Sequence, residues 1–195
     1  PSFTTDCKIR DGMGMELDSS SYKEAGCSFL LTGLSKGTYF FEVTINDSST
    51  ADYTGEVFMS KDIPEVEPND MFDDGTPLSV GQTGYGILPG VGMNKETADY
   101  WKINVNQKLA SDKKLKVTVD KKFWPAYDQL DVVLYKSNKM DQIDSDTTSY
   151  PAYEVESSKG LAKGTYFLEI KEDFSPSSYA GSFVGRYQVD VEAVK

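Results

Sequence analysis

The side chains best placed for chemistry lie in one short acidic segment, residues 63–75, with the sequence IPEVEPNDMFDDG. The segment contains no Lys or Arg. Pro64 and Pro68 favour an extended backbone at the residues that precede them, and side chains alternate along an extended chain. Three oxygen-bearing side chains are therefore expected to point the same way: Glu65, Glu67 and Asn69.

Oxygen ligands of this kind suit calcium. Ca²⁺ takes about six to eight oxygen atoms, which is more than Glu65, Glu67, Asn69 and Asp70 can supply. A second segment is therefore expected to complete the shell. The alternative is an acidic linker whose carboxylates are simply solvated.

The composition excludes several other kinds of site. The 195 residues include no His, which removes Ser-His and Cys-His nucleophile pairs and His-ligated zinc. With 20 Lys and Arg against 31 Asp and Glu, the formal net charge is −11, which argues against nucleic acid and anionic membrane surfaces as partners. The apolar stretches are too short to span a bilayer. The sequence opens at Pro1, as expected after removal of a signal peptide or for a fragment of a longer protein.

Alternation of apolar and polar residues predicts that strands position these side chains. In residues 114–120, for example, Leu115, Val117 and Val119 share one face. Turn-forming sequences such as Pro89-Gly90 separate the alternating segments. The pattern predicts an all-β fold, an antiparallel β-sandwich or jelly roll. The segments with the clearest alternation are residues 101–105, 114–120 and 187–194.

An internal repeat divides the chain. Residues 33–43 (GLSKGTYFFEV) match residues 160–170 (GLAKGTYFLEI) at eight of eleven positions, and looser matches flank them, including residues 18–22 with 146–150. We therefore predict a partial, second-half copy in residues 1–62 and a complete copy in residues 63–195. Either the partial copy leans on the complete domain, or its own front half was lost when a fragment was made.

A series of motifs runs through the complete copy, and it resembles the bacterial pre-peptidase C-terminal domain. Relatives of that domain include the collagen-binding domains of clostridial collagenases. The resemblance covers residues 63–195, and its tail half recurs in residues 7–61. It implies a jelly-roll β-sandwich attached to a secreted enzyme or a surface protein. The motifs are Glu65-Val-Glu-Pro-Asn-Asp70, Thr76-Pro-Leu-Ser-Val-Gly-Gln82, Asp99-Tyr-Trp-Lys-Ile-Asn-Val105, Leu130-Asp-Val-Val-Leu-Tyr135, Gly164-Thr-Tyr-Phe-Leu-Glu-Ile170 and Tyr187-Gln-Val-Asp-Val191.

The resemblance also implies a calcium site where the acidic segment meets the loop before the Asp-aromatic strand. Many members carry an Asp-x-Asp pair in that loop, whereas this chain has Glu96-Thr-Ala-Asp99. Glu96 is therefore the less well matched of the two loop residues. The ligands implied are Glu65, Glu67, Asn69 and Asp70 from the segment, with Asp99 and Glu96 from the loop.

Two further pairs of residues carry predictions. Cys7 and Cys27, the two cysteines of the chain, are predicted to form a disulfide in an oxidising compartment. The alternative is two separate buried thiols. Trp124 and Tyr127 lie between two predicted strands, where exposed aromatic rings can bind a sugar or a protein. The alternative for Trp124 is a cap over the end of the sandwich.

Together these features favour a non-catalytic, calcium-binding accessory or binding module of a secreted or surface bacterial protein, or of a periplasmic one. The expected cofactor is Ca²⁺, and the expected partner is an extracellular protein or a polysaccharide. Two alternatives stay open: a structural spacer in a surface array, and a glycosidase that uses paired carboxylates. The repeat and the resemblance weigh against the enzyme, because both assign the chain to sandwich units without a cleft.

Overall fold

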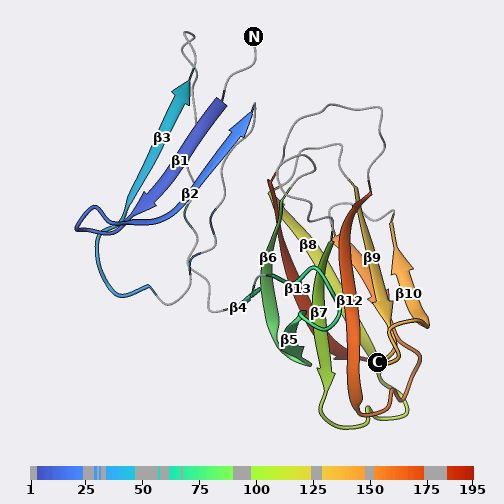
Figure 1. Ribbon diagram of the computed structural model, residues 1–195. Helices are drawn as coiled ribbons and strands as arrows, with labels where there is room; N and C mark the ends of the chain where they lie inside the picture. The colour runs from blue at the N-terminus through green and yellow to red at the C-terminus, as the bar shows by residue number, and fades with distance from the viewer. Residues whose placement is uncertain are drawn as a thin grey trace.

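The computed structural model describes residues 4–23, 29, 31, 34–46, 57, 62–66, 68–89, 98–123, 129–147, 152–173 and 184–195, and in these residues every regular element is a β-strand (Figure 1). None of the described residues forms a helix that could cross a membrane. The strands are β1 Thr4–Arg10, β2 Glu16–Lys23, β3 Phe40–Asn46, β4 Ile63–Pro64, β5 Thr76–Ser79, β6 Thr83–Pro89, β7 Ala98–Val105, β8 Lys114–Phe123, β9 Gln129–Tyr135, β10 Gln142–Asp146, β11 Ala152–Glu156, β12 Gly164–Asp173 and β13 Val184–Val194.

Strands β4 to β13 form a sandwich of two five-stranded sheets. One sheet, here called the β12 sheet, has the order β10-β9-β12-β7-β5, and the other, the β13 sheet, has the order β11-β8-β13-β6-β4. Neighbouring strands are antiparallel except for β5 beside β7 and β4 beside β6, which are parallel. Side chains of both sheets meet in one hydrophobic core, which includes Trp101, Val117, Leu168 and Tyr187.

The alternation in the sequence explains this core. Leu115, Val117 and Val119 of β8 are all fully buried, as their shared face predicts, and so are Tyr187 and Val189 of β13. The prediction of an all-β sandwich is confirmed. The jelly-roll connectivity stays a prediction, and so does the division into domains at residues 1–62 and 63–195.

Strands β1 to β3 form a separate three-stranded sheet, the N-terminal sheet, with the order β2-β1-β3. It repeats part of the β12 sheet, strand for strand. Phe40 pairs with Arg10, and the repeat partner of Phe40, Phe167, pairs with Tyr135. Strands β1, β2 and β3 thus correspond to β9, β10 and β12.

A bulge and a turn occur at the same place in both sheets. The register shifts beside Arg10 in the β1–β2 pair and beside Tyr135 in the β9–β10 pair. This register aligns Asp18 with Asp144, two positions away from the looser alignment made on sequence alone. The turn that follows has a positive φ in each copy, 84° at Gly14 and 60° at Lys139.

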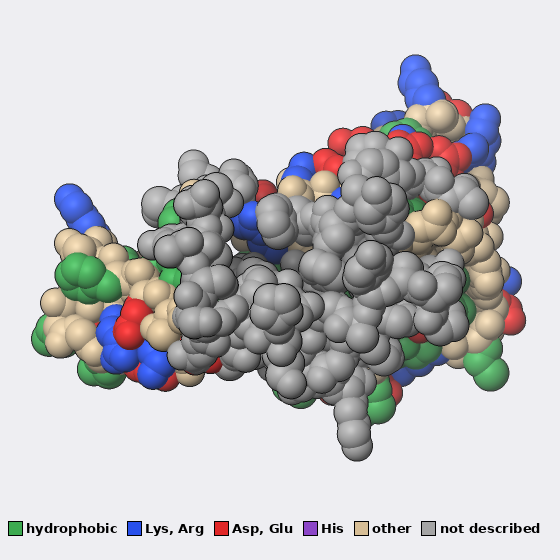
Figure 2. All heavy atoms as spheres, turned by 90° about the horizontal axis from the view of Figure 1, so that it is seen from above, with side chains coloured by type: hydrophobic (Ala, Val, Ile, Leu, Met, Phe, Trp, Pro, Cys, Tyr) green, Lys and Arg blue, Asp and Glu red, His purple; other side chains and the backbone are tan. Residues whose placement is uncertain are grey.

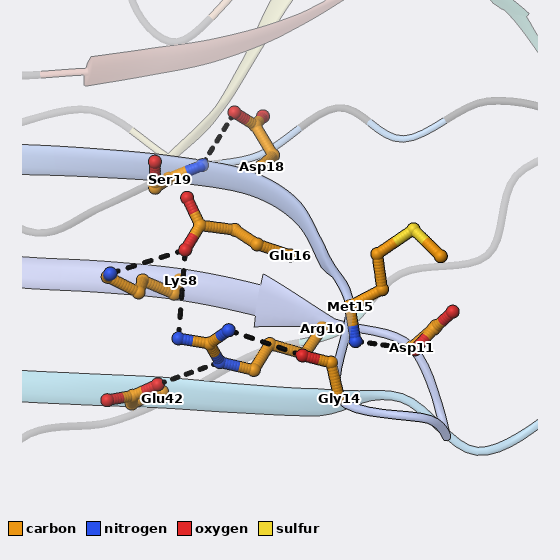
Figure 3. A network of polar contacts seen from close by, with 9 residues as sticks. All are labelled: Lys8, Arg10, Asp11, Gly14, Met15, Glu16, Asp18, Ser19 and Glu42. Carbon is orange, nitrogen blue, oxygen red and sulfur yellow. Dashed lines mark hydrogen bonds and ion pairs between the residues drawn. The ribbon is translucent and has the colours of Figure 1, made fainter.

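Ion pairs connect the three strands of the N-terminal sheet on the face that carries Arg10. Arg10 of β1 lies between the two neighbouring strands, with its Nε 3.1 Å from Glu42 Oε2 and its Nη2 3.7 Å from Glu16 Oε2 (Figure 3). Lys8 adds a contact of 3.2 Å to the same oxygen of Glu16. These contacts tie β1 to both β2 and β3, although exposed pairs of this kind contribute little free energy each.

Candidate functional site

The acidic segment is fixed to the sandwich by its backbone. The Glu65 N–H donates to the Tyr85 carbonyl of β6 at 2.9 Å, and the Tyr100 N–H of β7 donates to the Asn69 carbonyl at 3.1 Å. The Val66 N–H donates to Thr76 Oγ1 at 2.7 Å. The segment therefore contacts strands of both sheets.

Between these anchor points, four polar side chains from three separate segments of the sequence meet in a buried polar cluster: Glu65, Asn69, Asp99 and Tyr187. The Ile87 N–H donates to Glu65 Oε1 at 2.5 Å. Glu65 Oε2 accepts from Asn69 Nδ2 at 3.3 Å and from the Tyr187 hydroxyl at 2.9 Å. Buried polar atoms need such partners, since an unpaired one costs about 1–3 kcal/mol.

The Tyr187 hydroxyl is the centre of the cluster. It lies 2.6 Å from Asp99 Oδ2 and 2.9 Å from Glu65 Oε2, and it accepts a hydrogen bond of 3.1 Å from Trp101 Nε1. A phenol has one proton, so it can donate fully to only one of the two carboxylates at a time. Burial raises the pKa of Tyr187 well above its usual value, and the adjacent Asp99 and Glu65 raise it further. The hydroxyl is therefore a proton donor at neutral pH.

Two glycines in β6 make room for the cluster. A Cβ at Gly86 would lie 2.3 Å from the Tyr187 hydroxyl oxygen and 2.4 Å from Glu65 Oε2. A Cβ at Gly84 would lie 2.6 Å from the Trp101 ring. Only glycine permits approaches this close, and the spacing of two residues places both gaps on the same face of the strand.

The structure brings together three of the six predicted calcium ligands, Glu65, Asn69 and Asp99. Asp70, the next residue along the segment, is exposed. Glu67 and Glu96 lie outside the described residues. Within the described part of the chain, no group of three or more His, Cys, Asp or Glu side chains has the arrangement of a metal site. Calcium binding therefore stays a prediction.

The other predicted functional residues fall mainly outside the described ranges. Trp124 and Tyr127 do so, and so does Cys27. Cys7 is buried on β1. The disulfide stays a prediction, because the position of Cys27 is not described.

A second feature, which sequence reasoning did not single out, is an aromatic surface on the outer face of the β12 sheet. Phe72, just after the acidic segment's Asp70, packs its ring edge-on against three others. The centroid distances are 4.6 Å to Tyr100, 5.2 Å to Tyr135 and 5.4 Å to Phe167. Edge-to-face pairs at such distances contribute about 0.5–1.5 kcal/mol each beyond the area that they bury.

One carboxylate orders the two tyrosines of this surface. Tyr100 donates to Glu169 Oε1 at 2.7 Å and Tyr135 donates to Glu169 Oε2 at 2.9 Å. Partial burial, together with the bond to Glu169, raises the pKa of Tyr135 to about 12 and raises that of Tyr100 further. Both hydroxyls therefore stay protonated and fixed in direction.

Charged and flexible side chains border the aromatic surface. The Lys139 ammonium lies 5.2 Å above the Phe167 ring and contacts the carboxylate of Asp73. That contact lowers the pKa of Asp73. Met71 and Met140, which adjoin Phe72 and Lys139 in sequence, are exposed. Rigid aromatic rings beside flexible methionines are typical of protein-binding surfaces.

Signals for both features were present in the sequence. Two glycines two residues apart in a strand, Gly84 and Gly86, indicate a close approach by large side chains. A tyrosine on a core-facing position, Tyr187, requires a buried hydrogen-bond partner. The identity of that partner depends on long-range packing, which no local pattern specifies.

Neither a scan of the sequence against models of protein families nor a search of curated proteins finds a match. Among solved structures, the fold resembles the pre-peptidase C-terminal domain of a collagenase from Bacillus anthracis, with 14% identity, 60% of this chain and 94% of that chain covered, and a TM-score of 0.43. It also resembles PliG of Salmonella Typhimurium, a periplasmic inhibitor of g-type lysozyme, with 16% identity, 62% and 100% coverage, and a TM-score of 0.33. The first is a domain of the family that the sequence motifs resemble. These similarities concern the fold and assign no function to this chain.

Proposed function

We propose that this chain is a non-catalytic, calcium-binding accessory module of a secreted, surface or periplasmic protein, and that it binds an extracellular protein or polysaccharide. The observation that carries the proposal is the convergence of Glu65, Asn69 and Asp99 at one buried place. These residues come from two segments that the sequence separates by about thirty positions. The sequence predicts that both segments supply ligands to the same ion.

The chemistry of the cluster fits a hard cation. Its side-chain acceptors are carboxylate and amide oxygens, the ligands that Ca²⁺ prefers. Glu65 and Asp99 both lie against the hydroxyl of Tyr187 and so repel one another in a buried environment. A divalent cation would offset that repulsion. Glu67, Asp70 and Glu96 adjoin the cluster in sequence and would complete the oxygen shell.

The same geometry argues against the glycosidase alternative. A glycosidase needs two carboxyl groups that face a substrate across a cleft, about 5–9.5 Å apart. Glu65 and Asp99 are instead buried and hydrogen-bonded to Tyr187, where a sugar has no access. A role in holding structure or metal suits them better than catalysis.

Calorimetric titration of the metal-free protein with CaCl₂ tests the calcium site. We expect saturable binding, with a rise in melting temperature that corresponds to roughly 2.7 kcal/mol at a hundredfold excess over Kd. Asp99→Asn should abolish the binding isotherm. Glu154→Gln is the matched control, because it removes one carboxylate from an exposed ion pair with Lys116 on the other sheet. Absence of heat in the unmodified protein, with an unchanged melting temperature, would reject calcium.

The aromatic surface favours a binding module over a structural spacer. Its rings are packed in place before any partner arrives, which lowers the entropy cost of association. A pull-down with collagen and with insoluble polysaccharides separates the two functions. Met140→Asp should weaken retention, whereas Met13→Asp, at an exposed methionine in the turn between β1 and β2, should not. Equal losses from both variants would place the binding surface elsewhere.

An oxidising compartment is part of the proposal. A Cys7–Cys27 disulfide would be stable in a secreted or periplasmic protein. Thiol titration of the native, unreduced protein tests it. Two reactive thiols, in the native or the denatured state, would reject the pairing.

A further inference from the structure

One edge of β3 in the N-terminal sheet corresponds to the side of β12 that pairs with β7 in the sandwich. Strand β12, which corresponds to β3, pairs with β9 on one side and with β7 on the other. Strand β3 pairs with β1, the counterpart of β9, and among the described strands it has no neighbour on its other side. That side is the edge which β7 covers in the complete unit.

Exposure at matched positions follows this difference. Leu168 is fully buried in the sandwich, with 0% of its surface exposed, whereas Phe41 at the same position in β3 is 46% exposed. On the other face, Phe167 is 6% exposed and its counterpart Phe40 is 53% exposed. Figure 2 shows hydrophobic and charged side chains next to one another at the far left, where Figure 1 places the N-terminal part of the chain. Two large aromatic side chains of β3 thus lack the cover that the repeat provides.

The hydrogen bonds to the glutamate of β3 also differ from those to its counterpart on β12. Glu169 accepts one hydrogen bond from Tyr135 of β9 and one from Tyr100 of β7. Its counterpart Glu42 is bound on one oxygen by Arg10, which occupies the position of Tyr135. Tyr100 lies opposite Glu169 on β7. A strand beside β3 with a tyrosine at the same position would bring a hydrogen-bond donor to the second carboxylate oxygen of Glu42.

We propose that the edge of β3 with which no described strand pairs docks an extended segment from the front half of another unit of this kind, with the pattern of residues 98–105 (ADYWKINV). The segment would run antiparallel to β3, in the register that β7 takes on β12. In that register Trp101 of the segment lies opposite Phe41, and Tyr100 lies opposite Glu42. Main-chain hydrogen bonds would supply affinity and the alternate side chains would supply specificity, as in other cases of strand addition.

The proposal explains the composition of β3. An edge strand that faces only water is usually protected by charges, a proline or a bulge, because an open edge promotes aggregation. Strand β3 has the sequence FFEVTIN, with a single charged residue and no proline. This composition is typical of a strand whose edge is paired with another strand. The inference does not depend on calcium binding.

The test uses the full chain and a labelled synthetic peptide with the sequence of residues 97–106, in the presence of a chelator. We expect saturable binding by fluorescence anisotropy. Phe41→Asp should weaken it about tenfold or more, which corresponds to about 1.4 kcal/mol. Leu17→Asp should leave it within about twofold, since Leu17 is an exposed apolar residue on β2, the opposite edge of the same sheet. A peptide of scrambled order controls for composition.

Hydrogen exchange locates the peptide. Within residues 40–46, the amides that do not pair with β1 should exchange quickly in the free chain and slowly with peptide bound, while exchange in residues 16–23 should not change. Strong protection of those same amides without peptide would overturn the proposal, because the edge would then be covered already. Protection confined to the sandwich would do so as well. A dimer that Phe41→Asp dissolves would instead make the edge an interface between copies.

A double-mutant cycle tests the register. Glu42→Gln in the protein and Tyr100→Phe in the peptide should each weaken binding, and together they should weaken it by less than the product of the two effects. Independent effects would overturn the proposed register.

Discussion

The N-terminal sheet and its counterpart β10-β9-β12 have the same strand order, the same register and a bulge at the same position, yet their side chains lie in different surroundings. In the sandwich, strands β7 and β5 extend the sheet, and the β13 sheet covers its inner face. In the N-terminal sheet, Phe40 and Phe41 of β3 are about half exposed, whereas Phe167 and Leu168 at the equivalent positions of β12 are buried. Local sequence is therefore enough to specify the strand pattern. How far a side chain is buried depends on which other strands pack against the repeated ones.

Substitutions between the two sheets keep one face of the central strand buried and change the other face. Leu130 and Val132 of β9 are fully buried, and their counterparts in β1, Thr5 and Cys7, are buried as well, with 8% and 2% of their surfaces exposed. Tyr135, half-buried under Phe72, is replaced by Arg10, which makes exposed ion pairs. The two sheets therefore differ on the face of Arg10, where ion pairs take the place of the aromatic packing around Tyr135.

The largest expected effect comes from truncating one matched pair of side chains. Leu168→Ala should destabilise the protein by about 2–5 kcal/mol, because it opens a cavity in the core. Phe41→Ala should cost less, about 1 kcal/mol, because half of the ring is already in solvent and its ring contact is with Phe29, at 5.9 Å. Chemical denaturation measures both. Equal losses would mean that Phe41 is as well covered as Leu168.

Removing the hydroxyl of Tyr187 tests a feature for which the described part of the N-terminal sheet has no counterpart. Tyr187→Phe should cost about 1–3 kcal/mol, since it leaves the buried Trp101 Nε1 without this acceptor and removes one hydrogen-bond donor from Asp99. Hydrogen exchange should quicken in β6, β7 and β13 but not in β1 to β3. A uniform change across all strands would show that the two regions unfold as one.

The turns that contain Gly14 and Lys139 occupy equivalent positions in the two sheets, and substitutions in them should differ in their effect on stability. Gly14→Ala should destabilise the N-terminal sheet by about 1 kcal/mol, because a residue with a Cβ is strained at positive φ and no atom nearby would compensate. Lys139→Gly should relieve the same strain but lose the contacts with Asp73 and Phe167. Its net effect should therefore be close to zero. Thermal melts of both variants test the contrast, and a neutral Gly14→Ala would contradict it.

The smallest expected effect concerns alkaline pH, at the position where Tyr135 corresponds to Arg10. The pKa of Tyr135 is raised in the folded state to about 12. Its contribution to stability is therefore complete below the ordinary tyrosine pKa near 10 and is lost as the pH rises through about 12. Glu169→Gln should lower the pH at which phenolate absorbance appears. Glu42→Gln should not, because its partner Arg10 is not a phenol.

Sequence reasoning predicted the strands well because alternation is a local property. Leu115, Val117 and Val119 were assigned to one face from seven residues, and all three are fully buried. Strand β10 lies at the edge of its sheet, and its carboxylates Asp144 and Asp146 accept backbone hydrogen bonds from Glu156 and Glu154 of β11. The sequence alignment matched Asp18 with Asp146, whereas the strand register matches it with Asp144. An error of two residues cannot be detected from alternation, because it keeps every side chain on the same face.

The candidate site was predictable in its residues more than in its geometry. The spacing of Glu65 and Asn69 correctly indicated side chains on one side of the segment, since both are buried while Val66 is exposed. Nothing local indicated that Tyr187 would join them, because the contact spans most of the domain. The aromatic surface has the same origin: Phe72, Tyr100, Tyr135 and Phe167 come from four separate segments.

The hydrogen bond between Glu65 and Tyr187 has a consequence for the order in which the molecule folds. The two residues are 122 positions apart, and closing a loop of that length costs about 4 kcal/mol of chain entropy. Contacts of such long range form late, after hairpins such as β9–β10 have already appeared. Until β13 is in place, Glu65 and Asp99 lack the phenol between them and remain hydrated. The cluster thus forms only in the finished sandwich. The burial of the Tyr187 phenol, followed by absorbance or fluorescence, would report the final step of folding.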